Sequence, residues 1–176
     1  MWSPILIASA LAVAACSPSG QASQADKPFT VTTSIKELME SMIDPSADAL
    51  WEAVAVISTR EGVENRHPRT DEEWKALRSH AITLLETTNL LVMEGRRAAP
   101  IGTRAVDGEL SPEEIDRRIS TSRAAFIQYA QALRAPTLKA LAAIDRRDAD
   151  ELLAIGGEID AVCEACHVTF WYPNAY

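Results

Sequence analysis

The last part of the chain contains the sequence Cys163-Glu164-Ala165-Cys166-His167. A Cys-x-x-Cys-His pattern is typical of covalent c-type haem attachment, in which two thiols bond to a haem and the adjacent imidazole ligates its iron. On a helix these two cysteines and this histidine project from one face, because residues three and four apart are neighbours there. The motif therefore predicts one covalently bound haem c, with Cys163 and Cys166 as attachment sites and His167 as an axial iron ligand.

Two other chemistries use a similar cysteine spacing. A zinc site needs a fourth ligand, and the histidines outside the motif are His67 and His80. A thioredoxin-like redox pair follows a strand in a βαβ unit, whereas this sequence shows no strand alternation. Haem attachment is favoured over both. Residues 168–176 contain no methionine, so any protein ligand on the other side of the iron must come from upstream.

Length and charge limit the other functions. The 176 residues are enough for one domain with a hydrophobic core. The net charge is −8 and no basic cluster is present, so nucleic acid is not an expected partner. No acid–base pair or nucleophile constellation stands out, and the chain is not predicted to be an enzyme. With three cysteines, of which two lie in the motif, a disulfide framework is not indicated.

The first part of the sequence is typical of an exported protein. Residues 1–25 carry no charged side chain, and the apolar run 5–15 has the length of a signal-peptide core rather than of a membrane span. The run ends in Val13-Ala14-Ala15-Cys16, which resembles a bacterial lipoprotein box and predicts a lipid on Cys16. The alternative is a plain secretory signal, since no Lys or Arg precedes the apolar run. We expect a signal peptide over 1–15, a flexible tether over 16–30 and a periplasmic protein with a membrane anchor.

Helical periodicity begins at about Thr33. The bundle-facing stripe of the first helix is Ile35, Met39, Met42, Ser46, Ala49, Ala53 and Val56. Asp44-Pro45 predicts a kink or a new helix, because proline cannot donate a hydrogen bond to the carbonyl of residue 41. Residues 61–69 are expected to form a loop. A second helix is predicted from Thr70 or Asp71 to about Gly95, with the buried stripe Trp74, Leu77, Ala81, Leu84, Thr88 and Leu91.

A third helix is predicted after the connection 95–110. Ser111 caps it and Pro112 takes its first position. Its expected buried stripe is Ile115, Ile119, Ser122, Phe126, Tyr129 and Leu133, and it continues beyond a kink at Pro136 with Leu138, Leu141 and Ile144.

The fourth helix begins at Asp148 and carries the haem motif. Its inner face is Leu152, Ile155, Ile159, Val162 and Cys166. Gly156-Gly157 lowers helix propensity in mid-helix, which predicts close approach of haem or of a neighbouring helix. Four amphipathic helices predict an all-α protein, an antiparallel four-helix bundle over residues 31–176.

The segment from Ala142 to His167 resembles the end of class II cytochromes c, the cytochrome c′ family. The resemblance implies a four-helix bundle over about residues 31–172 and haem bound through Cys163, Cys166 and His167. High-spin members bind nitric oxide or carbon monoxide, whereas low-spin members place a methionine of the first helix on the iron and transfer electrons. Met39 best matches that position and Met42 is the alternative. Met93 and His80 are less favoured, because Met93 lies at the end of the second helix and His80 lies off its stripe.

The resemblance therefore implies an electron carrier that cycles between Fe(II) and Fe(III) with redox partner proteins, and the alternative is a gas-binding protein. Members often dimerise through their first two helices, which makes a homodimer an expectation of the resemblance. Two departures stand out. Ile35 occupies the place of a basic residue that contacts a haem propionate, for which Arg96, Arg97 and Arg123 are the substitutes considered. Aromatic residues at 170–172, rather than basic ones, follow the haem histidine, either shielding a haem edge or capping the bundle.

Overall fold

The computed structural model describes residues 29–173. The predicted signal segment 1–15, Cys16 and most of the predicted tether 16–30 lie outside the described residues. The elements follow one another in the order α1 (Ile35–Leu38), the π-helical turn η1 (Met39–Ile43), α2 (Asp44–Ala53), β1 (Ala55–Thr59), β2 (Gly62–Arg66), α3 (Asp71–Leu91), α4 (Pro112–Thr121), α5 (Arg123–Arg146) and α6 (Ala149–Phe170).

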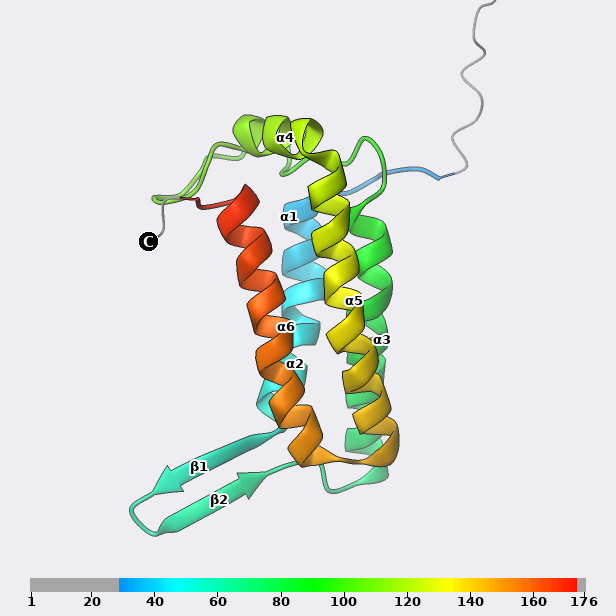
Figure 1. Ribbon diagram of the computed structural model, residues 1–176, viewed down its shortest axis with the longest axis vertical. Helices are drawn as coiled ribbons and strands as arrows, with labels where there is room; N and C mark the ends of the chain where they lie inside the picture. The colour runs from blue at the N-terminus through cyan, green and yellow to red at the C-terminus, as the bar shows by residue number, and fades with distance from the viewer. Residues whose placement is uncertain (1–28, 174–176) are drawn as a thin grey trace, which may run out of the picture. The chain divides into compact units, whose positions relative to one another are not determined.

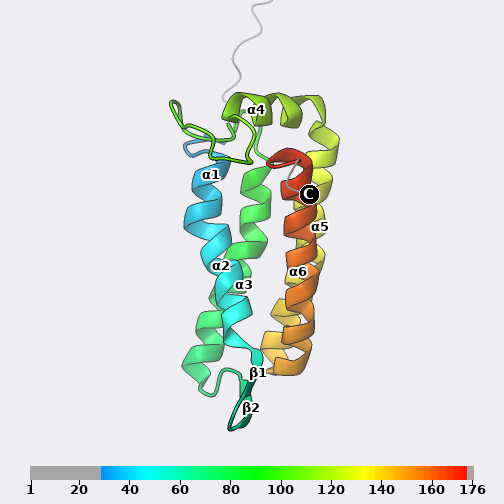
Figure 2. The same ribbon diagram turned by 90° about the vertical axis from the view of Figure 1, so that its left-hand side faces the viewer.

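The architecture is a bundle of four antiparallel helices, as predicted. Elements α1, η1 and α2 form one continuous first helix, and α3, α5 and α6 are the other three (Figure 1). The short helix α4 lies across one end of the bundle, and the β1–β2 hairpin projects from the other, as the view turned by 90° also shows (Figure 2). None of the helices between residues 29 and 173 combines the length and hydrophobicity that a membrane span needs.

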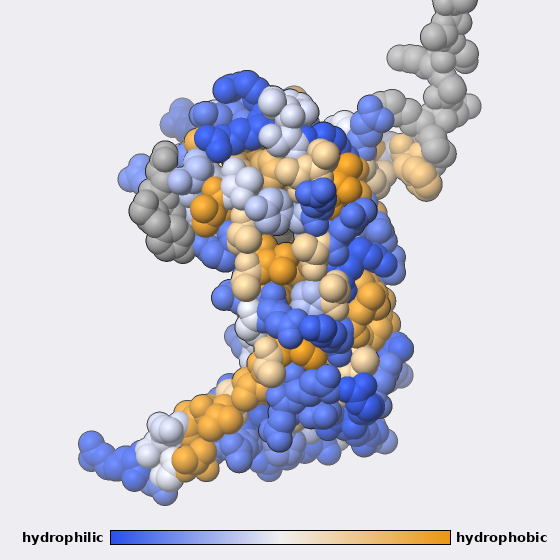
Figure 3. Space-filling model, viewed as in Figure 1, coloured by the Kyte–Doolittle hydropathy of each residue, from blue (hydrophilic) through white to orange (hydrophobic). Residues whose placement is uncertain are grey.

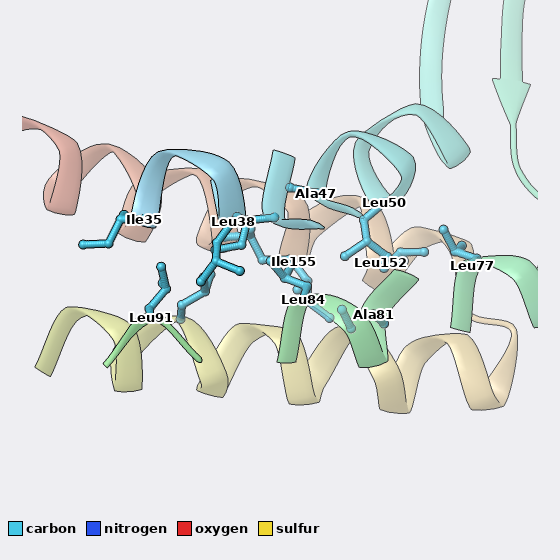
Figure 4. Packing of buried hydrophobic residues seen from close by; sticks show 14 of the residues in the cluster. Ile35, Leu38, Ala47, Leu50, Leu77, Ala81, Leu84, Leu91, Leu152 and Ile155 are labelled. Atoms are coloured by element: carbon cyan, nitrogen blue, oxygen red, sulfur yellow. The ribbon is translucent and has the colours of Figure 1, made fainter. Parts of the chain in front are cut away.

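The buried stripes of α3 and α6 follow the sequence pattern. All six predicted positions of α3 are buried, and in α6 Leu152, Ile155 and Ile159 are buried. In Figure 4, Leu84 of α3 and Ile155 of α6 lie among labelled core residues of the first helix, such as Leu38. The helix starts also agree with the sequence, because Thr70, Ser111 and Asp148 each accept a hydrogen bond from a backbone N–H of the first turn.

The core stripe of the first helix differs from the prediction. The buried residues are Ile35, Leu38, Ile43, Ala47, Leu50 and Val54, whereas Met39, Met42, Ala49 and Ala53 are half-buried and Val56 is 59% exposed. The step of five residues from Leu38 to Ile43 falls at η1, where the Asp44 N–H bonds to the Met39 carbonyl. A π-turn inserts one residue into the helix and so shifts the phase of every later position. Among the stripe positions predicted after Met39, Ser46 is also buried, as predicted, whereas Met42, Ala49, Ala53 and Val56 are not.

Pro45 gives the physical reason for this π-turn. In an α-helix the proline ring would clash with the carbonyl of residue 41, and its nitrogen has no hydrogen to donate. A widened turn just before Pro45 relieves that conflict without ending the helix, so the predicted break at Asp44-Pro45 is replaced by a π-turn. The Ser41 hydroxyl donates to the Glu37 carbonyl at 2.5 Å within the widened turn.

The β1–β2 hairpin was not predicted. The sequence pattern predicts a first helix that continues to Val56 and a loop over residues 61–69. In the structure the helix ends before Val54, and the chain then forms two antiparallel strands with Ile57 opposite Glu64. Residues 54–59 are rich in β-branched side chains, which favour extended backbone. The turn at Arg60-Glu61 ends at Gly62, whose φ of 143° suits glycine.

The predicted third helix is divided in two. The chain turns at Ser122, so α4 and α5 have different directions, and Ser122 itself is exposed rather than buried. Ser120, Thr121 and Ser122 are consecutive hydroxyl residues, which compete with helical hydrogen bonding. Helix α5 then runs through Pro136 to Arg146, and Leu138 is 48% exposed, so its predicted place in the core is wrong.

The connection between α3 and α4 closes one end of the bundle. The first N–H groups of α1 donate to the carbonyls of Arg97 and Ala98, at 2.8 and 2.9 Å. The Ala98 N–H donates to the Asp116 carboxylate of α4, and the Leu110 N–H donates to the Trp171 carbonyl after α6. Because these bonds satisfy groups that helix ends leave unpaired, the long connection holds α1, α4 and α6 together.

Replacing Leu84 with alanine should lower the free energy of unfolding by about 2–5 kcal/mol, because Leu84 is 0% exposed and its removal leaves a cavity. The matched change Leu153→Ala, at a position 40% exposed on α6, should cost less than about 1 kcal/mol. Denaturant unfolding followed by circular dichroism measures both. Equal losses would contradict the burial of Leu84.

Candidate functional site

One cavity lies between the four helices of the bundle. Its volume is about 380 Å³, within the range of small-ligand and cofactor sites. Its walls are mainly apolar, and hydrophobic residues reach the surface between α5 and α6 (Figure 3). The lining residues are Met39, Ile43, Asp44, Ala47, Asp48, Trp51, Leu91, Phe126, Tyr129, Ala130, Leu133, Asp160, Val162, Cys163, Glu164, Cys166 and His167.

The motif residues all face this cavity. Cys163, Cys166 and His167 lie in the last two turns of α6, and each of the three side chains is half-buried and lines the cavity wall. The two cysteines are free thiols. Two thiols and an imidazole thus stand on one face of one helix, beside a space bounded by the other three helices.

Met39 lines the same cavity from the first helix, whereas Met42 does not. Met42 is half-buried and packs against the hydrophobic core. Both methionines lie in η1 and pack against the core, but of the two only Met39 also lines the cavity. The structure thus brings Met39 together with His167, two residues far apart in sequence.

The other predicted ligands lie elsewhere. The Met93 sulfur is 3.5 Å from a guanidinium nitrogen of Arg96, away from the cavity lining. His67 and His80 line a separate cavity of about 360 Å³ beside α2 and α3. Within residues 29–173, no group of three or more His, Cys, Asp or Glu side chains is arranged to hold a metal ion. The zinc alternative therefore lacks its ligand set there.

The buried thiols are held in the neutral form. Burial raises the pKa of Cys163 to about 11, and the nearby Asp160 and Asp44 carboxylates add to the shift. Burial raises the pKa of Cys166 to about 12, with a smaller contribution from Cys163. Since the thiolate is the nucleophile, both side chains are unreactive at neutral pH in the folded haem-free chain.

Asp44 and Tyr172 flank the imidazole of His167. Partial burial raises the pKa of the Asp44 carboxyl, and the charge of His167 opposes that shift. The Tyr172 ring lies 5.6 Å from the His167 ring, and its hydroxyl donates to the Glu164 carboxylate at 2.8 Å. Asp44 is not a member of the stripe predicted for the first helix. It follows the π-turn η1, which shifts the helical phase, and it lines the cavity.

The three arginines considered for a propionate contact are engaged in structural bonds. Arg96 donates to the carbonyls of Leu90 and Thr33, and Arg97 pairs with Asp116. Arg123 bonds to the Val92 carbonyl and lies 5.6 Å above the Phe126 ring. None of the three lines the cavity.

The aromatic residues that end α6 have different surroundings. Phe170 is buried, with its ring 5.4 Å from Phe126 and 6.0 Å from Tyr129 in edge-on contacts. Tyr172 instead lies beside His167. Phe170 thus caps the core, as one of the two alternatives expects, and Tyr172 lies against the histidine of the motif.

No protein-family model and no curated protein matches the chain. Three solved structures share its arrangement of helices. A cytochrome c′ is 23% identical, with a TM-score of 0.47, covering 77% of this chain and 87% of that chain. The nitric oxide complex of a variant of cytochrome c prime from Alcaligenes xylosoxidans is 21% identical, with a TM-score of 0.48, covering 77% and 92%. A ferrous variant of cytochrome c prime from the same organism is 18% identical, with a TM-score of 0.47, covering 78% and 93%.

The raised thiol pKa values predict slow alkylation of the folded haem-free chain. With Cys16→Ala, so that only Cys163 and Cys166 react, iodoacetamide at pH 7.5 should modify Cys163 roughly a hundredfold, and Cys166 roughly a thousandfold, more slowly in the folded protein than in the denatured protein. The reason is that the thiolate fraction falls tenfold for each unit by which the pKa rises. Mass spectrometry at timed intervals measures both rates. Equal rates in the folded and denatured chains would contradict the burial of the two thiols.

Proposed function

We propose that this chain is a covalently haem-binding protein of the four-helix-bundle type. The observation that carries the proposal is the cavity that collects Cys163, Cys166 and His167 from one helix and Met39 from another. These are the donor types that c-type cytochromes use, namely two thiols for attachment and an imidazole and a thioether for the iron.

The residues present fit a haem. The cavity lining offers apolar contacts from Ile43, Leu91, Phe126 and Leu133, which suit the faces of a large planar ring. The two thiols lie three residues apart on α6, the spacing of the attachment motif, and His167 directly follows the second. Haem, when bound, supplies a one-electron Fe(II)/Fe(III) couple.

More particularly, the protein is a low-spin class II cytochrome c that carries electrons. Met39 is the sixth ligand in this proposal, because it lines the cavity and Met42 does not. In this proposal Met39 on η1 and His167 on α6 would both ligate the iron. Because both lie on packed helices, their positions would change little when the haem gains or loses an electron. The apolar lining excludes water, which favours the less charged reduced state.

The proposal includes export, because c-type haem is attached outside the bacterial cytoplasm. The segment 1–15 is the signal in this proposal, and Cys16 anchors the mature protein to a membrane through a lipid. The electrons are exchanged with other redox proteins on the periplasmic side.

A second function, binding of nitric oxide or carbon monoxide, uses the same attachment residues with a weak or absent sixth ligand. Met39 in the cavity lining favours the electron carrier over this alternative. Uptake of carbon monoxide by the reduced protein distinguishes them, since a firmly bound thioether slows it and an open position does not.

Covalent attachment is tested by haem staining on a denaturing gel after coexpression with the haem-attachment machinery. The wild-type chain should stain, and the double variant Cys163→Ser, Cys166→Ser should not, because the serine hydroxyls form no thioether bonds. Cys16→Ser is the matched control and should still stain. An unstained wild-type band would disprove the proposed function.

The sixth ligand is tested with Met39→Leu and the matched variant Met42→Leu, which keep side-chain volume and remove one sulfur each. Met39→Leu should give a high-spin optical spectrum and fast carbon monoxide uptake, while Met42→Leu should keep the low-spin spectrum of the wild type. A high-spin wild-type spectrum in both redox states would instead support the gas-binding function.

A further inference from the structure

Trp51 forms part of the cavity wall and is held there by the helix that carries the haem motif. It lies in the last turn of α2 and is half-buried. Its indole N–H donates to the Gly156 carbonyl of α6 at 3.1 Å. Helix carbonyls normally accept bonds from their own helix, so this contact is an additional tie between α2 and α6.

Gly156 makes this contact sterically feasible. A Cβ atom built on Gly156 would lie 3.1 Å from Cδ1 and 3.6 Å from Nε1 of the Trp51 ring. The first distance is shorter than an ordinary carbon–carbon contact, so the ring would have to move away. The same construction at Gly157 meets nothing within 4 Å. A side chain at Gly156 would therefore press on the Trp51 ring, whereas one at Gly157 would meet open space.

The hydrogen bond also decides which part of the indole faces the cavity. Because its only donor is used by Gly156, Trp51 offers no polar group to the interior and contributes the surface of an aromatic ring. Trp51 and Cys163 line the same cavity, and Gly156 lies two helical turns before Cys163 on α6. The indole bonded to the Gly156 carbonyl and the Cys163 thiol therefore belong to the lining of one cavity.

We propose that Trp51 is a positioning residue of the haem site, fixed by the Gly156 carbonyl so that its indole closes the cavity and keeps water from the bound haem. The proposal rests on the proposed function for its consequence, a raised reduction potential, because exclusion of water disfavours the charged ferric state. The position of the ring itself does not depend on haem.

The test compares Gly156→Ala with the matched variant Gly157→Ala, and adds Trp51→Phe, which keeps an aromatic ring and removes the N–H. The near-ultraviolet circular dichroism of the haem-free chain reports the ring position, with the contribution of Trp51 taken as the wild-type minus Trp51→Phe difference. The midpoint potential of the haem-loaded protein reports water exclusion. Thermal unfolding reports the purely structural effect.

Gly157→Ala should keep the Trp51 dichroism and the potential, and should raise the unfolding temperature because alanine is the better helix former. Gly156→Ala should weaken the Trp51 dichroism and lower the reduction potential. Its unfolding temperature should not rise as that of Gly157→Ala does. Trp51→Phe should lower the potential as well, since phenylalanine is smaller and untethered.

Unchanged potentials in Gly156→Ala and Trp51→Phe, with stained and folded proteins, would overturn the proposal and reduce Trp51 to a packing residue. An unchanged Trp51 dichroism in Gly156→Ala would also overturn it. If the wild-type chain binds no haem, the proposed function fails, while the dichroism of the haem-free variants still decides whether Gly156 positions the indole.

Discussion

The structure depends on how the first helix passes Pro45. A proline in the middle of an α-helix removes one hydrogen bond and collides with the preceding turn. Here the chain adds a residue to that turn instead of ending the helix, so that Leu38 and Ile43, five residues apart, both face the core. Met39, the first residue of this turn, lines the cavity, whereas Met42 in the same turn does not. Packing of the bundle and composition of the site thus share one backbone feature.

The cavity wall shields the thiols of Cys163 and Cys166 from water mainly by burial. Burial keeps Cys163 and Cys166 protonated, and the nearby carboxylates add to this effect. The aromatic side chains that surround the site have their polar atoms engaged elsewhere, with the Trp51 N–H on Gly156, and the Tyr129 hydroxyl within hydrogen-bonding distance of the Thr169 hydroxyl. These aromatic residues therefore offer mainly apolar ring surface to the cavity, and its carboxylates come from Asp44, Asp48, Asp160 and Glu164.

The two ends of the bundle are built differently. At one end, the connection after α3, the crossing helix α4 and the buried Phe170 pack together through backbone bonds and ring contacts. At the other end, the chain leaves α2 for a hairpin whose Val56 and Val63 are largely exposed (Figure 3). The cavity lies nearer the closed end, where the motif residues of α6 meet η1.

Local chemistry in the sequence determined the bundle class, the helix caps at Thr70, Ser111 and Asp148, the stripe of α3 and the placement of the motif on one face of α6, because these depend on spacing along one helix. Three other local features overrode the helical spacing. The π-turn before Pro45 shifted the phase of the first helix, the β-branched residues from Val54 onward formed strands, and the hydroxyl residues Ser120, Thr121 and Ser122 divided the third helix. Tertiary structure decided which residues of different helices meet. The partnership of Trp51 with Gly156 likewise joins residues a hundred positions apart. A glycine pair in the sequence signals a close approach, but which glycine is approached, and by what, is set only when two helices pack.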